Sequence, residues 1–313
     1  MATMEGNHSE EMHVGSFSGH VVPGSMFAIT GFLNSIQIYH HYFLARKNQG
    51  EYRATHARPL WCFHGGKTRL KQIEAICRFV LVLIGIIGEL ATSYNSTTKQ
   101  WTNKMMHAEH ITMFAGFGIS ALVDIFSYDN TLGCLPEGSD YFCGLGAVMI
   151  EFVLFLYHLH GRNPLNTHLH IILIYTIGFM AITTVTECIY RDKVIWSIAR
   201  VYSIWLQGTW FWQIAFILFN PANNSKSTLD TEDPESIMIA TLYLAGHIIL
   251  GFAVQFVIGF LVYVCHGRPS TQSRNYVKLS DGAMGNSSTA SSSTTSTNRN
   301  DSDIEETNLL EMA

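Results

Sequence analysis

Charged residues are scarce in this 313-residue sequence, where they make up 14% of the chain, against about a quarter in ordinary soluble domains. The net charge of −5 comes largely from loops and the C-terminal tail, and the sequence carries no basic patch typical of nucleic-acid binding. It contains no P-loop, nucleophile elbow, HExxH motif or glycine-rich dinucleotide fingerprint, so standard soluble catalysis has no support. Residues 1–20 lack Lys, Arg and an apolar core, so no cleavable signal peptide is expected.

Seven long apolar stretches are present instead. About 20 residues of helix cross the hydrocarbon of a bilayer, and these stretches have that length. Only helices and closed barrels satisfy every backbone hydrogen bond in lipid, so the sequence predicts an all-α polytopic membrane protein with a seven-helix transmembrane bundle. Residues 1–20 would form a short lumenal tail, residues 21–266 the membrane domain and residues 267–313 a cytosolic tail. The predicted spans are residues 22–44, 73–93, 106–127, 141–160, 168–190, 194–219 and 237–264.

The basic residues predict the orientation. Most of them lie in the loop 46–72 and after the fifth and seventh stretches, and the positive-inside rule places these segments in the cytosol. The N-terminus is therefore expected in the lumen or outside and the C-terminus in the cytosol, with the acidic loop 128–140 as a mild exception. The six cysteines fall on or near the cytosolic side, where thiols stay reduced, so no disulfide framework is expected. Three sequons on the lumenal side are predicted glycosylation sites: Asn7, Asn95 and Asn223.

Histidines cluster around one tight turn, in the segment "YHLHGRNPLNTHLHIILIY" at residues 157–175. Further His and Glu side chains fall at the same lumenal end, and Glu151 lies seven residues before His158, on the same helix face. Ionisable groups at this depth are costly and normally face the interior of a bundle. Because imidazole and carboxylate are ligands of Zn²⁺, we predict a metal site, with zinc as the candidate ion. The predicted ligands are His110, Glu151, His158 and His168, with His20, Glu89, His160, His170 and His247 as further candidates.

Two other interpretations of this cluster stay open. Histidine titrates near neutral pH, so the same groups are suited to proton handling in an acidic lumen. Alternatively, the histidines at the turn are structural and satisfy carbonyl groups at the membrane interface. Toward the cytosolic half, Asp124 is expected to be buried, and Glu187 is expected to pair with Arg200 across two helices.

The C-terminal tail has a different composition. Its run "GNSSTASSSTTSTNRN" contains too few apolar residues to fold and is predicted to be disordered. Two short motifs in the tail are typical of sorting signals, which clathrin adaptor complexes bind as extended cytosolic peptides. They predict residence in endosomal, lysosomal or trans-Golgi membranes, with the plasma membrane as an alternative. The motif residues are Tyr276 and Leu279 in "YVKL", and Glu305, Leu309 and Leu310 in "EETNLL".

Several segments of the membrane domain resemble the transmembrane protein 45 family. These segments are "GHVVPG" at 19–24, "HITMF" at 110–114, "GISALVDI" at 118–125, "EFVLFLYHLHGRNPLNTHLHIILIY" at 151–175, "ECIYRD" at 187–192 and "LQGTWFWQI" at 206–214. The resemblance implies a multi-pass protein, often of Golgi, endosomal or lysosomal membranes, with no established reaction. His107 does not match a motif position of the family. The polar positions that match are His20, Glu89, His110, Asp124, Glu151, His158, His160, His168, His170, Glu187 and His247.

Three classes of function are left open by the sequence. The first is a membrane scaffold or trafficking protein, in which the histidines hold the bundle together and the tail is the active part. The second is an intramembrane zinc hydrolase acting on a lipid, with Glu89 or Glu151 as the base that activates metal-bound water. The third is a transporter that relays protons or metal ions through the same groups. The first is the main prediction, and enzymatic activity stays undecided at this level.

Overall fold

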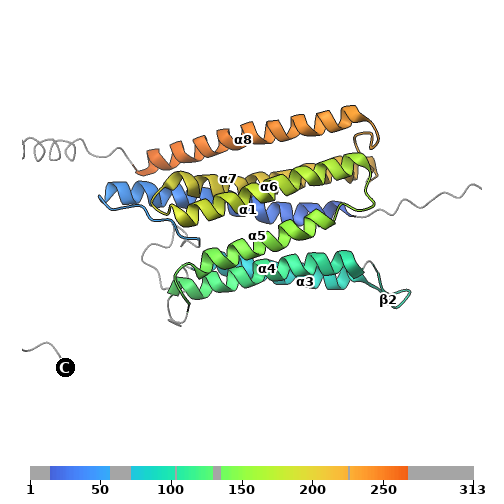
Figure 1. Ribbon diagram of the computed structural model, residues 1–313, viewed down its shortest axis with the longest axis horizontal. Helices are drawn as coiled ribbons and strands as arrows, with labels where there is room; N and C mark the ends of the chain where they lie inside the picture. The colour runs from blue at the N-terminus through green and yellow to red at the C-terminus, as the bar shows by residue number, and fades with distance from the viewer. Residues whose placement is uncertain (1–14, 57–71, 103, 130–134, 225, 267–313) are drawn as a thin grey trace, which may run out of the picture. The chain divides into compact units, whose positions relative to one another are not determined.

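The computed structural model describes residues 15–56, 72–102, 104–129, 135–224 and 226–266. Seven long α-helices run through this described part of the chain (Figure 1). The predicted sorting residues of the tail and Asn7 lie outside the described residues. The elements are α1 Phe17–Lys47, α3 Ile73–Ser93, β1 Tyr94–Asn95, β2 Gln100–Trp101, α4 Lys104–Asp129, α5 Ser139–Tyr157, α6 Pro164–Ile189, α7 Val194–Leu218, η2 Pro221–Asn223 and α8 Pro234–His266.

Each of the seven apolar stretches coincides with one of these helices, and the all-α prediction is confirmed. Side-chain caps explain where two of the helices begin. The Ser16 hydroxyl oxygen accepts a hydrogen bond from the Gly19 backbone N–H at 3.0 Å, immediately before α1. The Asn163 side chain does the same for the Asn166 N–H at 2.8 Å, and Pro164 then occupies the first position of α6.

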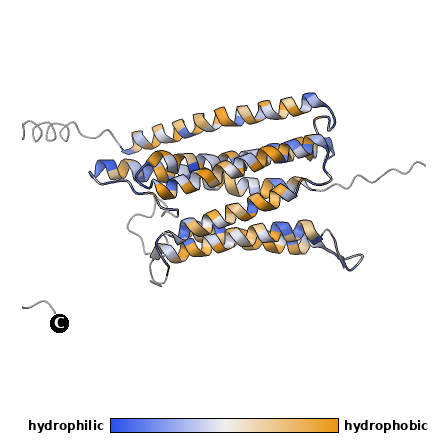
Figure 2. Cartoon of the chain, in the orientation of Figure 1, coloured by the Kyte–Doolittle hydropathy of each residue, from blue (hydrophilic) through white to orange (hydrophobic). Residues whose placement is uncertain are grey.

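Six of the helices are long and apolar enough to cross a membrane: α1, α3, α4, α5, α6 and α8. Figure 2 shows apolar residues along the helices and more hydrophilic residues toward their ends. Large apolar side chains are exposed on the outward faces, for example Ile87 on α3, Ile182 on α6 and Phe256 on α8. Such faces are stable in lipid tails, which are as apolar as the side chains themselves. The chain is therefore a multi-pass membrane protein.

The remaining long helix, α7, packs against α1, α6 and α8, and most of its side chains are buried. Glycines allow α1 and α7 to approach closely, because a Cβ atom added to Gly208 would collide with the backbone of Ala28. On the α6 side, Trp210 donates a hydrogen bond from Nε1 to the carbonyl of Leu169 at 3.1 Å. Both of these residues belong to the main apolar core, which α6 and α7 form together with neighbouring side chains.

Successive helices run in opposite directions, and two groups of contacts between polar side chains lie at the two ends of the bundle. The start of α4 contacts the end of α3, and the segment after α5 contacts the start of α6. We call the end where α1, α4, α6 and α8 begin the His20 end. The opposite end, where α3, α5 and α7 begin, is called the Asp124 end. The predicted metal ligands belong mainly to the His20 end.

Candidate functional site

Glu89 ties α3 to α4 at the His20 end. Its two carboxylate oxygens accept hydrogen bonds from Nδ1 of His107 at 2.5 Å and from Nδ1 of His110 at 2.9 Å. A carboxylate only accepts, so both imidazoles donate from Nδ1. The two histidines are three residues apart on α4 and therefore lie on one face of that helix. The structure thus brings the predicted residues Glu89 and His110 together, and it adds His107 as a direct partner.

A second carboxylate, Glu109, joins α4 to the end of α5. Its Oε2 accepts a hydrogen bond from Nδ1 of His158 at 2.8 Å. Sequence reasoning missed Glu109, although it stands between His107 and the candidate His110 in "HAEH" at residues 107–110. The rings of His158 and His110 lie beside each other, with centroids 6.2 Å apart. The two carboxylate–imidazole groups are therefore neighbours.

Two more imidazoles continue the row into α6 and α1. The His170 ring lies 6.1 Å from the His158 ring and 5.7 Å from the His20 ring, between centroids. His170 Nδ1 donates to the carbonyl of Asn166 at 2.9 Å, and His20 Nδ1 donates to the carbonyl of Ser16 at 2.9 Å. His170 is fully buried, and its Nε2 has no hydrogen-bond partner within the described residues. The histidine network, as we call it, comprises Glu89, His107, Glu109, His110, His158, His170 and His20.

Arg162 adds a positive charge to the turn beside this network. Its Nε donates to the carbonyl of His158 at 2.8 Å, and its Nη1 donates to Oδ1 of Asn166 at 2.9 Å. Burial lowers the pKa of Arg162 to about 10, against the opposing effect of Glu109. Burial and the nearby Arg162 charge hold the pKa of His158 below its usual value, and Glu109 again opposes the shift. A permanent cation therefore discourages protonation of the adjacent imidazole.

Three other predicted histidines do not join the network. His168 turns toward α8, where its Nε2 lies 3.1 Å from the Thr241 hydroxyl. His247 lies on α8, with its Nε2 3.2 Å from Oε1 of Gln213. His160 is exposed and donates only to a local carbonyl in the turn. Their clustering in the sequence is therefore not a clustering in space.

Glu151 is buried away from any histidine partner. Its Oε1 accepts a hydrogen bond from Nε2 of Gln207 on α7 at 2.8 Å, and its Oε2 has no partner in the described part of the chain. Among the described residues, no group of three or more His, Cys, Asp or Glu side chains is placed to hold a metal ion. The structure does not gather the four ligands that the sequence suggested, because each has a separate partner: His110, Glu151, His158 and His168.

The Asp124 end holds a second set of buried charges. Asp124 is fully buried, as expected, and its oxygens lie 3.0 Å from Nδ1 of His56 and 2.6 Å from Nη2 of Arg78. Sequence reasoning missed His56, which comes from the segment after α1 and has no periodic signal. The expected ion pair between Glu187 on α6 and Arg200 on α7 is confirmed, and both side chains are buried. Charged pairs therefore hold the helices together at this end also.

Two of the predicted glycosylation sites lie within the described residues. Asn95 is exposed in β1, and its Oδ1 accepts backbone hydrogen bonds from Thr97 at 2.9 Å and Thr98 at 3.1 Å. Asn223 is exposed in η2, in the connection from α7 to α8. Both asparagines lie at the His20 end, because α3 and α7 finish there.

Two comparisons with known proteins show what this chain is similar to. A family model described as a family of unknown function (DUF716) matches residues 139–264, from α5 into α8. Transmembrane epididymal protein 1 of Rattus norvegicus is 23% identical over 254 residues, which are 76% of this chain and 77% of that protein. The region matched by the family model contains His158 and His170. It does not include Glu89 or the histidines of α4.

Proposed function

We propose that this chain is a pH-responsive scaffold or trafficking protein of Golgi, endosomal or lysosomal membranes, related to the transmembrane protein 45 family. In this proposal all seven long helices cross the bilayer, with the His20 end in the lumen and the C-terminal tail in the cytosol. The concentration of basic residues after α1, α6 and α8 supports this orientation. The two tail motifs support sorting by clathrin adaptor complexes.

The observation that carries the proposal is that the histidine network joins several helices at the His20 end. Glu89 links α3 to α4, Glu109 links α4 to the end of α5, and the His170 ring contacts groups from α5 and α1. Histidine is the side chain whose ordinary charge change falls between pH 5 and 8. Acidification of the lumen would therefore change the charges that hold these helices together.

Acid is expected to affect the members of the histidine network differently. A carboxylate faces the ring at His110 and at His158, although at His158 burial and the Arg162 charge outweigh it and hold the pKa below its usual value. At His170 and His20 the described partners are backbone carbonyls and each other's rings, so two charges there would repel. We therefore expect acid to loosen the contact between α1 and α6 more than the contacts of α4, where carboxylates face the imidazoles.

Hydrogen exchange on the purified full-length chain in lipid nanodiscs tests this proposal. Exchange at pH 7.2 and pH 5, corrected for the intrinsic rate, should rise in acid at the starts of α1 and α6. A His170→Asn variant should lose most of this rise, whereas His160→Asn, outside the network, should keep it. An exchange pattern that is the same at both pH values in the wild type would contradict the proposal.

The two alternative functions have weaker support. The zinc hydrolase needs a shared ligand set, and the described residues do not form one. The transporter needs a polar route from the His20 end to Asp124, and Glu151 between them contacts only Gln207 among the described hydrogen bonds. Elemental analysis of the purified chain separates the classes, because stoichiometric zinc that a His158→Ala/His168→Ala variant loses would favour a metal site.

A further inference from the structure

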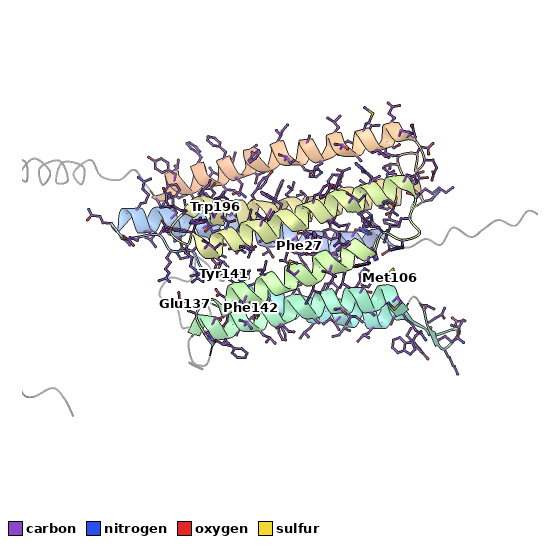
Figure 3. The ribbon with its side chains drawn as sticks, viewed as in Figure 1. Phe27, Met106, Glu137, Tyr141, Phe142 and Trp196 are labelled. Atoms are coloured by element: carbon purple, nitrogen blue, oxygen red, sulfur yellow. The ribbon has the colours of Figure 1, made fainter. Side chains whose placement is uncertain are left out.

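Two guanidinium groups converge on one exposed carboxylate at the Asp124 end. Nη2 of Arg53 lies 2.6 Å from Oε1 of Glu137, and Nη1 of Arg191 lies 3.2 Å from the same oxygen. Arg53 follows α1, Glu137 precedes α5, and Arg191 lies between α6 and α7, so the three residues come from distant parts of the chain. Figure 3 shows Glu137 near the beginning of α5, close to Tyr141 and at the opposite end of the bundle from Met106.

The backbone and side-chain contacts around both arginines hold them in place. The Arg191 guanidinium lies over the ring of Tyr141, 4.8 Å from its centroid. The Arg191 carbonyl accepts a hydrogen bond from the N–H of Ala54 at 2.7 Å, and the Tyr52 hydroxyl donates to the Ser197 hydroxyl at 2.8 Å. The residues on both sides of Arg53 are therefore anchored to the start of α7 and the turn before it. The backbone of both arginines and the side chain of Arg191 are therefore in place before any ligand binds.

An ion pair at the protein surface holds Glu137. Its side chain is 74% exposed, and the Arg53 side chain that it contacts is 69% exposed. Exposed ion pairs of this kind contribute little to stability, because water and salt screen them. The Glu137 carboxylate can therefore leave the arginines for solvent with little loss of free energy.

A cavity of about 440 Å³ lies next to this arrangement. Arg53, Arg191, Gly138 and Asp140 line it together with apolar side chains that include Phe126. Gly138 is the N-cap of α5, and no side chain caps the helix there, so the partial positive charge of the helix start is directed at the cavity region. Asp140 supplies the opposing charge, and its Oδ2 already accepts a hydrogen bond from the backbone N–H of His56 at 3.3 Å.

We propose that Arg53 and Arg191 form a binding site for a phosphate monoester, in which the Glu137 carboxylate occupies the ligand position when the site is empty. Guanidinium groups match phosphate oxygens in geometry, and a dianionic phosphate attracts two of them more strongly than one carboxylate does. The site lies where α4 and α6 end and α5 begins, so it would lie at the level of lipid headgroups when these helices span a bilayer. The ligand is thus the monoester headgroup of a phospholipid such as phosphatidic acid or a soluble phosphate monoester, and the site is independent of the histidine network.

Native mass spectrometry of the detergent-purified full-length chain tests this proposal with short-chain phosphatidic acid, phosphatidylcholine and glycerol 3-phosphate. Phosphatidic acid should bind more tightly than phosphatidylcholine. Arg53→Ala should weaken that binding about tenfold, as the loss of one charge-assisted contact implies. Glu137→Gln should strengthen it, because the competing carboxylate is gone. Arg46→Ala is the matched control, since Arg46 is a basic residue in the last turn of α1 at the same end of the bundle.

The outcomes distinguish a lipid ligand from a soluble one, and specific binding from general attraction between charges. If glycerol 3-phosphate binds as tightly as phosphatidic acid and with the same variant pattern, the site takes a soluble phosphate. An equal loss of binding in Arg46→Ala and Arg53→Ala would show general attraction to charge and overturn the proposal. Unchanged binding in Glu137→Gln would also overturn it. Arg191→Lys keeps the positive charge but loses the planar guanidinium group, so it should weaken binding. It is a milder test than Arg191→Ala, which removes the charge as well.

Discussion

The carboxylate of Glu109 on α4 and the imidazole of His158 after α5 form a hydrogen bond of 2.8 Å that joins two neighbouring helices. Both side chains are mostly shielded, at 24% and 16% exposure. The same carboxylate opposes the effect of Arg162 on the His158 ring. This one contact therefore joins α4 to α5 and also counteracts the Arg162 charge in the turn after α5.

Removing this carboxylate should loosen the bundle. Glu109→Gln replaces a charged acceptor with a neutral amide, so we expect a loss of about 1 kcal/mol in the free energy of unfolding. Thermal unfolding in detergent, followed by intrinsic fluorescence, measures the lower midpoint. Glu232→Gln, in the connection before α8, serves as the control and should leave the midpoint unchanged. An equal shift in both variants would show that Glu109 has no special part in the packing.

The stability of the fold should depend on pH through His158. Its pKa in the folded protein is lowered, by burial first and then by the Arg162 charge, so protons bind the unfolded chain more readily. The neutral ring therefore stabilises the fold above the unfolded pKa of about 6.5, and this stability is lost as the pH falls below that value. The unfolding midpoint should drop between pH 7.5 and pH 5. The drop should be smaller in His158→Gln and unchanged in His160→Gln; an unchanged drop in His158→Gln contradicts this assignment.

The buried pair of Glu187 and Arg200 should show strong coupling. Glu187→Ala leaves the Arg200 charge buried beside α6 without its carboxylate, and we expect a loss of about 3–5 kcal/mol. The double variant Glu187→Leu/Arg200→Met removes both charges and should recover most of that loss. A double-mutant cycle on unfolding midpoints measures the coupling. Additive effects of the single changes would show that the two side chains act independently.

Glycosylation reports the orientation of the bundle. If the His20 end faces the lumen, Asn223 should carry a glycan, and Asn223→Gln should remove one glycosidase-sensitive shift on a gel. Asn95 is exposed as well, but its side chain is engaged in a turn and lies directly at the end of α3, so modification there should be weaker. A glycan on a sequon introduced at residues 137–139 would instead place the Asp124 end in the lumen.

The apolar stretches determined the positions of the helices, because length and hydropathy are local properties of the chain. The stretch at 73–93 coincides with α3 at both ends, and the one at 194–219 differs from α7 by one residue. The pairing of Glu187 with Arg200 also followed from sequence, since two opposite charges in adjacent buried helix ends have few other ways to be satisfied. The sequence likewise indicated that histidines and carboxylates would concentrate at the end where α5 and α6 meet.

Only the tertiary structure decided which of these polar groups meet. Residues two positions apart on a helix point to nearly opposite faces, so His168 contacts α8 while His170 joins the network. The same rule turns His107 toward α3 and Glu109 toward α5. Sequence proximity counts neighbours along the chain, whereas a site depends on helix rotation and on the choice of adjacent helices. Side-chain packing sets both the rotation of each helix and the helices that lie beside it, and this packing couples residues far apart in the sequence.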